Sequence, residues 1–242
     1  MAAATISLPP RWAADSLTRH LDGALNNILA TATIEPKEYP LLVDIDFAFQ
    51  TIAQALNNPR NVLEGLLLFR CHAAFRAASM LAMSGHNPEV FPLMRSCLEI
   101  ALYAFHIAQN PEKADVWLGR HDDAQSKARM TTEFRIGTIK NTLKASDPGL
   151  ALTCEELYAR SIDFGGHPNE RAVTASLTIS KEEGKHLLKQ DYLAGGTMDH
   201  QHSIKSVAQA GLFGLLIFQR IFRERFDILG ITDVLEPIKA KL

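Results

Sequence analysis

The sequence predicts a mainly α-helical protein: a multi-helix bundle around a central αα-hairpin, with a small β-hairpin near residues 172–193. Two long apolar segments within residues 61–110 meet at Ser84-Gly85-His86-Asn87-Pro88, where Gly85 can stop one helix and Pro88 can open the next. Elsewhere apolar residues recur every three or four positions, the helical period, except in one stretch with the strand period of two. We therefore expect the apolar hairpin to form the core.

The first sixty residues predict a pair of amphipathic helices. Apolar residues repeat at helical spacing on either side of a break before Pro40. The two stripes are Leu17, Leu21, Leu25 and Ile28, then Leu41, Ile45, Phe49, Ile52 and Leu56. Residues 1–60 are thus predicted to add two helices to the hairpin.

The second half of the chain predicts outer helices, the β-hairpin and a closing helix. Residues 111–170 are more polar, which is typical of an exposed helical layer. Within 171–195 the period changes, because Val173, Ala175, Leu177 and Ile179 alternate with Thr and Ser. Residues 196–242 hold a long apolar helix, from about residue 203 to 226, and a tail. No linker or repeat divides the chain, so residues 1–242 are predicted to form one domain.

Composition narrows the classes of partner. The 242 residues are 47% hydrophobic, enough for a substantial core, and the net charge of −2 gives no global attraction to nucleic acid or an anionic membrane. The longest uninterrupted apolar runs fall short of a membrane span, the three cysteines form no short-spaced pair, and the first residues lack the pattern of a signal peptide. We therefore expect a cytoplasmic protein with no DNA or membrane partner.

Polar residues on the hairpin are few and fall in register. Arg95, Glu99, Tyr103 and His106 are spaced 4, 4 and 3, so they share one stripe of their helix, and His72 and Arg76 share a stripe of the preceding one. Folding about His86 would place Glu99 level with the gap between His72 and Arg76. This predicts a charged seam in the core. The seam is either an ion-paired network that fixes helix register or a pocket whose two arginines bind a phosphate or carboxylate while Glu99 or a histidine transfers a proton.

A second cluster lies at a glycine-marked helix end, Tyr158-Ala159-Arg160-Ser161-Ile162-Asp163-Phe164-Gly165-Gly166-His167. Together with the apolar hairpin and its internal Arg and Glu, residues 61–169 resemble the HEPN-type helical domains, whose nuclease members carry Arg, four to six residues, then His. The resemblance implies that Arg160 would contact the scissile phosphate. It also implies that His167 would transfer a proton at the ribose 2′-hydroxyl or the leaving oxygen, without metal. The chain departs from the family pattern at two points. Ser161 follows the arginine where the family commonly has Asn, Asp or His, and two glycines, Gly165 and Gly166, precede His167.

Two function hypotheses follow. The first is a HEPN-like, metal-independent, RNA-directed protein, such as an endoribonuclease of a defence or toxin system. The second is a non-catalytic helical module that binds a protein partner or a small anionic ligand. No cofactor or metal is predicted, although His200 and His202 beside Asp199 could bind a transition metal if they are not simply a helix cap region. The apolar last helix, with Gly211 and Gly214 permitting close approach, predicts a homodimer.

Overall fold

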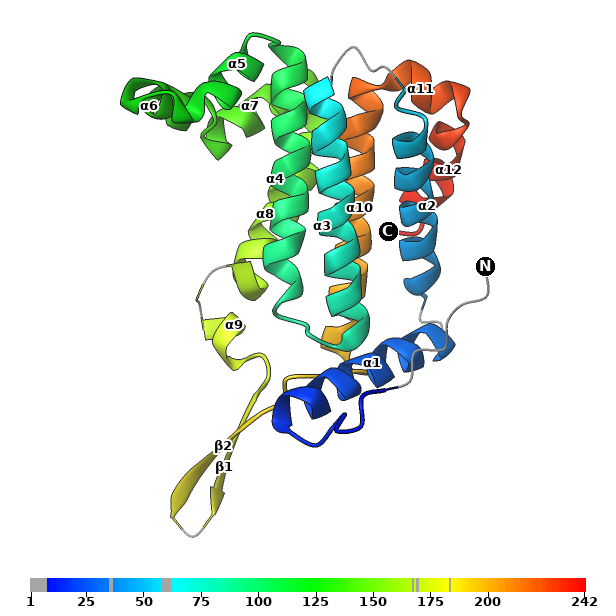
Figure 1. The fold of residues 1–242 in the computed structure, drawn as a ribbon, viewed down its shortest axis with the longest axis vertical. Coiled ribbons are helices and arrows are strands. Elements are labelled where there is room, and N and C mark those ends of the chain that lie inside the picture. Colours follow the sequence, from blue (N-terminus) through cyan, green and yellow to red (C-terminus); the bar gives the residue numbers. More distant parts are fainter. Residues whose placement is uncertain (1–7, 35–36, 58–61, 167, 169, 183) are drawn as a thin grey trace.

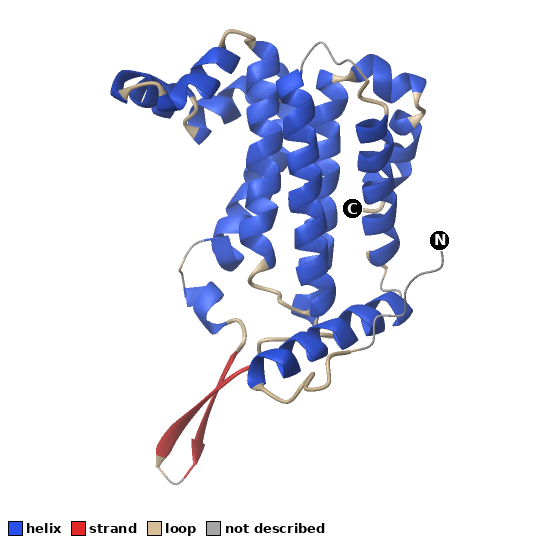
Figure 2. Cartoon of the chain, in the orientation of Figure 1, coloured by secondary structure: helices blue, strands red, loops and turns tan. Residues whose placement is uncertain are grey.

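The computed structural model describes residues 8–34, 37–57, 62–166, 168, 170–182 and 184–242. Long helices run side by side along the long axis of the molecule, one helix lies across one end, and short helices lie at the other (Figures 1 and 2). The fold is mainly α-helical, and within the described residues its strands form one two-stranded antiparallel sheet, so the predicted fold class is confirmed.

Three long helices make the centre of the bundle: α3 (Val62–Ser84), α4 (Val90–Gln109) and α10 (Met198–Ile221). The predicted αα-hairpin is α3 followed by α4, and its turn has the geometry of a helix ended by glycine. Gly85 adopts a positive φ of 85°, and the His86 amide donates to the Leu81 carbonyl at 3.0 Å, the bond that closes a Schellman motif. The large side chains buried here include Phe75, Phe105 and Phe213.

The closing helix α10 lies inside the bundle, so its apolar surface and its two glycines, Gly211 and Gly214, are not free to meet a second copy. A Cβ built on Gly211 would come within 2.6 Å of the Phe75 ring of α3, and one on Gly214 within 3.1 Å of Cys71 Sγ. The two glycines therefore bring α10 close to helices of its own chain. They do not support the homodimer, which stays a prediction.

Further helices pack around this centre. On one side α2 lies against α3, α10 and α12, the helix that the C-terminal tail forms. On the other side α7 and α8 pack on α4, and Asp147 caps α8 by accepting a hydrogen bond from the Leu150 amide at 2.9 Å. The bounds are α2 (Tyr39–Gln54), α5 (Lys113–Leu118), η1 (Gly119–His121), α6 (Ala124–Glu133), α7 (Ile136–Ser146), α8 (Pro148–Ser161), η2 (Ile162–Gly166), α11 (Arg223–Ile228) and α12 (Ile231–Lys239).

The β-hairpin is confirmed, but it is shorter than predicted. Strand β1 (Leu177–Glu182) pairs antiparallel with β2 (Lys185–Gln190), and Ile179 lies opposite Leu188. The expected alternation from Val173 instead begins in a short helix, α9 (Glu170–Thr174), in which the Thr174 hydroxyl donates to the Glu170 carbonyl at 2.6 Å. Four residues of apparent alternation were therefore too few to distinguish a strand from one helical turn.

Helix α1 (Ser16–Ile34) crosses one end of the bundle (Figure 1). Its small and polar face contacts the bundle: the Asn27 side chain donates to the Ser84 carbonyl at 3.0 Å, and the Thr31 hydroxyl donates to the Met83 carbonyl at 2.9 Å. The stripe of leucines that predicts this helix points the other way and is exposed. The helix is confirmed, yet its apolar face is not the one that covers the core.

Among the described residues, α3 and α4 are long and apolar enough to cross a membrane when judged by length and composition alone. The uninterrupted apolar runs within them are shorter, because Arg76 interrupts α3 and Arg95 interrupts α4. Core helices of water-soluble proteins meet the same criterion, and both helices are packed within the bundle.

Candidate functional site

The predicted charged seam exists as two separate clusters rather than one. His72 and Arg76 turn away from α4 and bind Asp46 of α2: His72 Nε2 lies 2.6 Å from Asp46 Oδ1, while Arg76 Nε and Nη2 donate to the two carboxylate oxygens at 2.6 and 2.9 Å. Arg76 in turn lowers the pKa of Asp46. The prediction that Glu99 meets these two residues is therefore wrong, because the partner they needed comes from α2, outside the hairpin.

Glu99 is instead the centre of a cluster between α4 and α8. Its Oε1 accepts hydrogen bonds from Arg95 Nε at 2.9 Å and from the Tyr158 hydroxyl at 2.8 Å. The Tyr158 ring lies between two cations, with Arg95 Cζ 5.0 Å and Lys140 Nζ 3.9 Å from its centroid. Burial and the bond to Glu99 raise the pKa of the Tyr158 hydroxyl to about 12. With 34% of its side chain exposed, Glu99 lies at the surface of the bundle.

A groove opens beside this cluster on the outer face of the central hairpin. It has a volume of about 550 Å³ and a mostly apolar wall. Its residues come from α3, α4 and α5: Leu63, Leu66, Leu67, Arg70, Ser96, Glu99, Ile100, Tyr103, Trp117 and Leu118. We call it the α3/α4/α5 groove. A concave apolar surface with a few polar groups is the usual form of a small-ligand site.

Two polar groups of the groove are available to a ligand. Within the part of the chain that the structure describes, the Arg70 guanidinium and the Ser96 hydroxyl make no hydrogen bond, and Arg70 forms no ion pair. Glu99 is already paired with Arg95. Since that pair is neutral overall, Arg70 supplies the net charge at the groove, which favours an anionic group on a ligand.

The other two residues of the predicted stripe have structural partners. The Tyr103 hydroxyl lines the groove but donates to the Phe134 carbonyl at 3.2 Å. His106 is buried, with Nδ1 2.8 Å from the Thr142 hydroxyl, and burial lowers its pKa. His106 therefore joins α4 to α7, and nothing places it at the groove.

Arg160 is held by neutral and acidic partners at the α8–α10 contact. Its Nη1 donates to Gln209 Oε1 and, at 3.5 Å, to the Ser206 hydroxyl, while Nη2 donates to Glu156 at 2.8 Å. Only 18% of its side chain is exposed. A phosphate would have to displace these contacts to reach it. The predicted partner, His167, lies outside the described residues.

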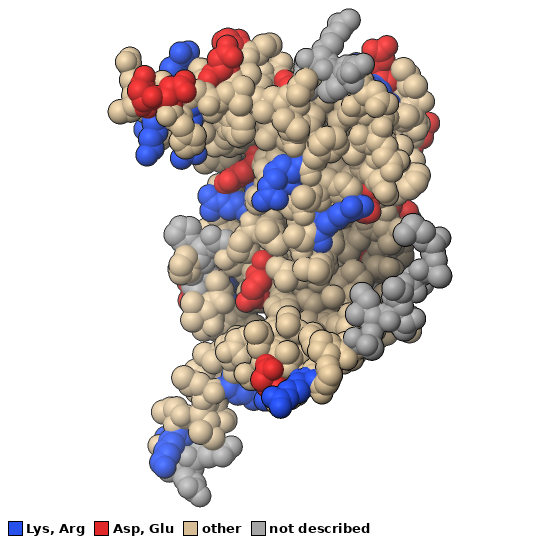
Figure 3. Space-filling view, viewed as in Figure 1, with Lys and Arg blue, Asp and Glu red and all other residues tan. Residues whose placement is uncertain are grey.

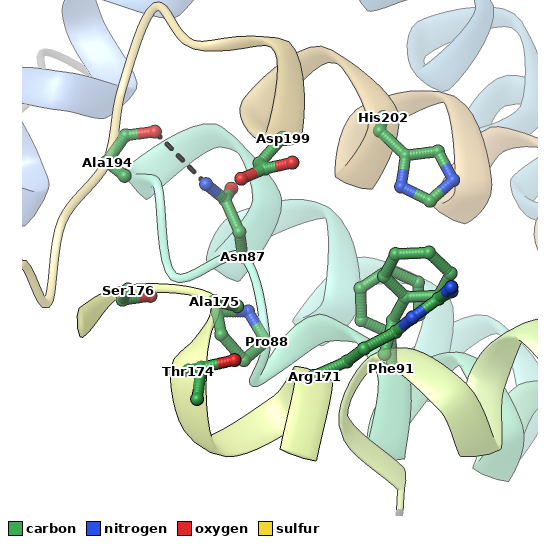
Figure 4. Close-up of a pocket in the computed structure, with 11 residues that line it drawn as sticks. Asn87, Pro88, Phe91, Arg171, Thr174, Ala175, Ser176, Ala194, Asp199 and His202 are labelled. Atoms are coloured by element: carbon green, nitrogen blue, oxygen red, sulfur yellow. Dashed lines mark hydrogen bonds between the residues drawn. The ribbon is translucent and has the colours of Figure 1, made fainter. Parts of the chain in front are cut away.

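A small cavity of about 230 Å³ lies beside η2, next to α9 and the start of α10 (Figure 4). His202 faces Phe91 across it, and the Arg171 guanidinium lies 5.4 Å from the centroid of the Phe164 ring. Burial lowers the pKa of His202, and the charge of Arg160 lowers it further. Asp199 also lines the cavity, so its charges nearly balance.

His200 and His202 do not converge as a metal site would require. His200 Nδ1 accepts a hydrogen bond from the Gly196 amide at 3.1 Å, in the cap of α10, whereas His202 packs against Phe164 with ring centroids 4.9 Å apart. Residues two apart on a helix point to different sides. In the described ranges, no three His, Cys, Asp or Glu side chains are arranged so that they could hold a metal ion.

Sequence reasoning missed Asp46, Lys140, Arg70 and Ser96. Asp46 is an acidic residue beside the core position Ile45, but only the packing of α2 on α3 shows which cations it meets. No sequence pattern marks Arg70. Its role depends on two features that only the structure shows: it has no ion-pair partner among the described residues, and it lines the groove.

The comparisons with known proteins add no family. No protein-family model, curated protein or solved structure matches the chain.

Proposed function

We propose that this protein is a non-catalytic helical module that binds a small anionic ligand with an apolar body in the α3/α4/α5 groove. The observation that carries the proposal is Arg70, an unpaired cation among the described residues, at a mostly apolar groove of about 550 Å³. The apolar wall would take the body of the ligand, while Arg70 and Ser96 would bind its carboxylate, sulfonate or phosphate.

The chemistry around Glu99 supports binding rather than turnover. The carboxylate is shared by Arg95 and Tyr158, and the pKa of Tyr158 is raised to about 12, so the phenol stays protonated at neutral pH and holds Glu99 in place. The Tyr158 phenol is therefore not poised to exchange a proton near pH 7. The pair therefore acts as a rigid side wall of the groove.

A titration with 8-anilinonaphthalene-1-sulfonate, an aromatic anion that fluoresces in apolar sites, tests the proposal. A charge-assisted hydrogen bond contributes about 1.5–3 kcal/mol, so Arg70→Gln should weaken binding about tenfold or more. The matched control is Arg135→Gln, an exposed arginine outside the groove, which should bind as wild type. Ile100→Trp, which fills the groove, should abolish the signal.

Competition identifies the ligand class. Decanoate should displace the probe, whereas decylammonium, with the same chain and the opposite charge, should not. Equal displacement of the probe by both compounds, or an equal loss of probe affinity in Arg70→Gln and Arg135→Gln, would show that the site does not select an anion. Unchanged binding of the probe to Ile100→Trp would show that the ligand binds outside the α3/α4/α5 groove.

The second candidate is the HEPN-like, metal-independent activity on RNA, at the cavity beside η2. The observation that favours it is the gathering of His202 and Arg171 at this cavity, close enough to Arg160 for its charge to affect the pKa of His202. Its weakness is electrostatic: on the face in Figure 3, lysines and arginines are interspersed with acidic residues, and the net charge is −2.

Cleavage of RNA in the presence of EDTA tests this second candidate. The products should carry 2′,3′-cyclic phosphates, DNA should survive, and both His167→Ala and His202→Ala should lose activity. His121→Ala, at an exposed histidine of η1, is the control and should cleave normally. Wild-type protein that leaves a broad RNA panel intact would exclude the candidate.

A further inference from the structure

Helix α1 presents its apolar face to solvent. Leu17, Leu21, Leu25 and Leu29 form a stripe along the helix, and each is between 44% and 65% exposed. A different face of the helix, with Asn27 and Thr31, is bonded to the end of the bundle. Since apolar side chains at helical spacing normally cover a core, this arrangement leaves a leucine surface without a partner in the described chain.

The β-hairpin forms an arm that leaves the body of the protein beside α1 (Figure 1). The chain after β2 returns along this helix, where Leu193 lies 3.1 Å from the position of a Cβ on Gly23. Ile179 and Leu188 are opposite each other in the ladder, so they share one face of the arm, and they are 60% and 69% exposed. A two-stranded hairpin alone is marginally stable in water, so the arm needs a surface to pack on.

We propose that two copies of this chain exchange arms, so that the Ile179/Leu188 face of each arm packs on the leucine stripe of the other copy's α1. The arm and the stripe lie next to each other, so a single two-fold axis can relate the two contacts, in which each copy's arm packs on the other copy's stripe. Such an interface is isologous and closed, so it stops at a dimer. The proposal is independent of the ligand groove, which lies on α3, α4 and α5.

The area and charge of the two surfaces fit a second copy. At roughly 100 Å² exposed for each of the six apolar residues, the exchange buries about 1,200 Å² over both copies, the lower bound of a standard interface. The stripe is flanked by Asp15 and Asp22, and Lys181 lies on the same face of the arm as Ile179 and Leu188, so opposite charges can meet at the rim of the contact. Helix α1 has one basic residue, Arg19, besides His20, whereas helices that lie on anionic membranes are rich in lysine and arginine.

Sedimentation velocity of the full chain at micromolar concentration tests the proposal. Wild type should sediment at twice the chain mass of 26.7 kDa. The double variant Leu21→Glu/Leu25→Glu and the single variant Leu188→Glu should each sediment as monomers, with unchanged helical circular dichroism because the replaced side chains are exposed. Leu152→Glu on α8, at a leucine that is 73% exposed, is the control and should remain dimeric.

Crosslinking distinguishes arm exchange from other dimers. One chain carrying Ile179→Cys is mixed with another carrying Leu21→Cys, and a short bismaleimide should join the two; the native cysteines are buried. A monomeric wild type, a dimer that survives either glutamate variant, or the absence of this product from a dimer would overturn the proposal. Binding of a monomeric wild type to phosphatidylserine vesicles would assign the leucine stripe to a membrane instead.

Discussion

Gly211→Ala should destabilise the protein, although alanine is normally the better residue in a helix. The new methyl group would lie 2.6 Å from two atoms of the Phe75 ring and 2.9 Å from Ile45 Cγ2. Both neighbours are almost fully buried, so neither can move into solvent. The substitution therefore forces α10 and α3 apart at the centre of the bundle.

The magnitude follows from two opposing effects. Overpacking a dense core costs about 1–3 kcal/mol, and replacing glycine by alanine inside a helix recovers up to about 1 kcal/mol. Because the contacts are far inside van der Waals distance, we expect a net loss of about 2 kcal/mol. Gly137→Ala in α7 is the matched control: nothing lies within 4 Å of its new methyl group, so it should gain up to about 1 kcal/mol.

Urea denaturation followed by circular dichroism measures both free energies of unfolding. In a Phe75→Leu background the penalty of Gly211→Ala should shrink, because the smaller side chain makes room for the methyl group. A Gly211→Ala variant as stable as Gly137→Ala, or a penalty that is the same in both backgrounds, would refute the placement of α10 against α3.

The remaining predictions concern charge and pH. Glu99→Gln should lower the free energy of unfolding by about 1 kcal/mol, because Glu99 is partly exposed; breaking a fully buried pair would cost roughly 3 kcal/mol. The same substitution should lower the pKa of Tyr158 from about 12, as measured by spectrophotometric titration. Burial lowers the pKa of four histidines, His72, His106, His200 and His202, below the ordinary value of 6.5. Below this pH the unfolded chain binds more protons than the folded chain, so the free energy of unfolding should fall. Unfolding midpoints that are equal at about pH 7 and about pH 5 would contradict this. The lowered pKa of Asp46 adds a loss of stability as the pH falls below 3.8, and Asp46→Asn should remove that part of the acid dependence.

The fold could be predicted where local chemistry decides it. Gly85 and Pro88 mark the central turn, and the apolar spacing from Leu41 to Ile52 marks α2, because helix ends and amphipathic faces depend on near neighbours in sequence. The direction of the α1 stripe could not be predicted. An amphipathic pattern shows that an apolar face exists, but it does not show whether that face meets the same chain.

The site was harder to predict because its partners are distant in sequence. The i,i+4 pair Arg95 and Glu99 follows from helical spacing, and it is present. Tyr158 reaches Glu99 across 59 positions, and Asp46 reaches Arg76 across 30. Equal distance from the turn aligned Glu99 with His72 and Arg76, yet helix rotation sends those two side chains to α2 instead.

The central claim, that the α3/α4/α5 groove binds an apolar anion, is tested most directly by methyl nuclear magnetic resonance of the protein titrated with decanoate. Shifts and intermolecular Overhauser effects should appear at the methyl groups of Leu63, Leu66 and Ile100, and Arg70→Gln should shift the titration to higher decanoate concentration. Responses confined to the leucine stripe of α1, or to Ala175 at the cavity beside η2, would contradict the account.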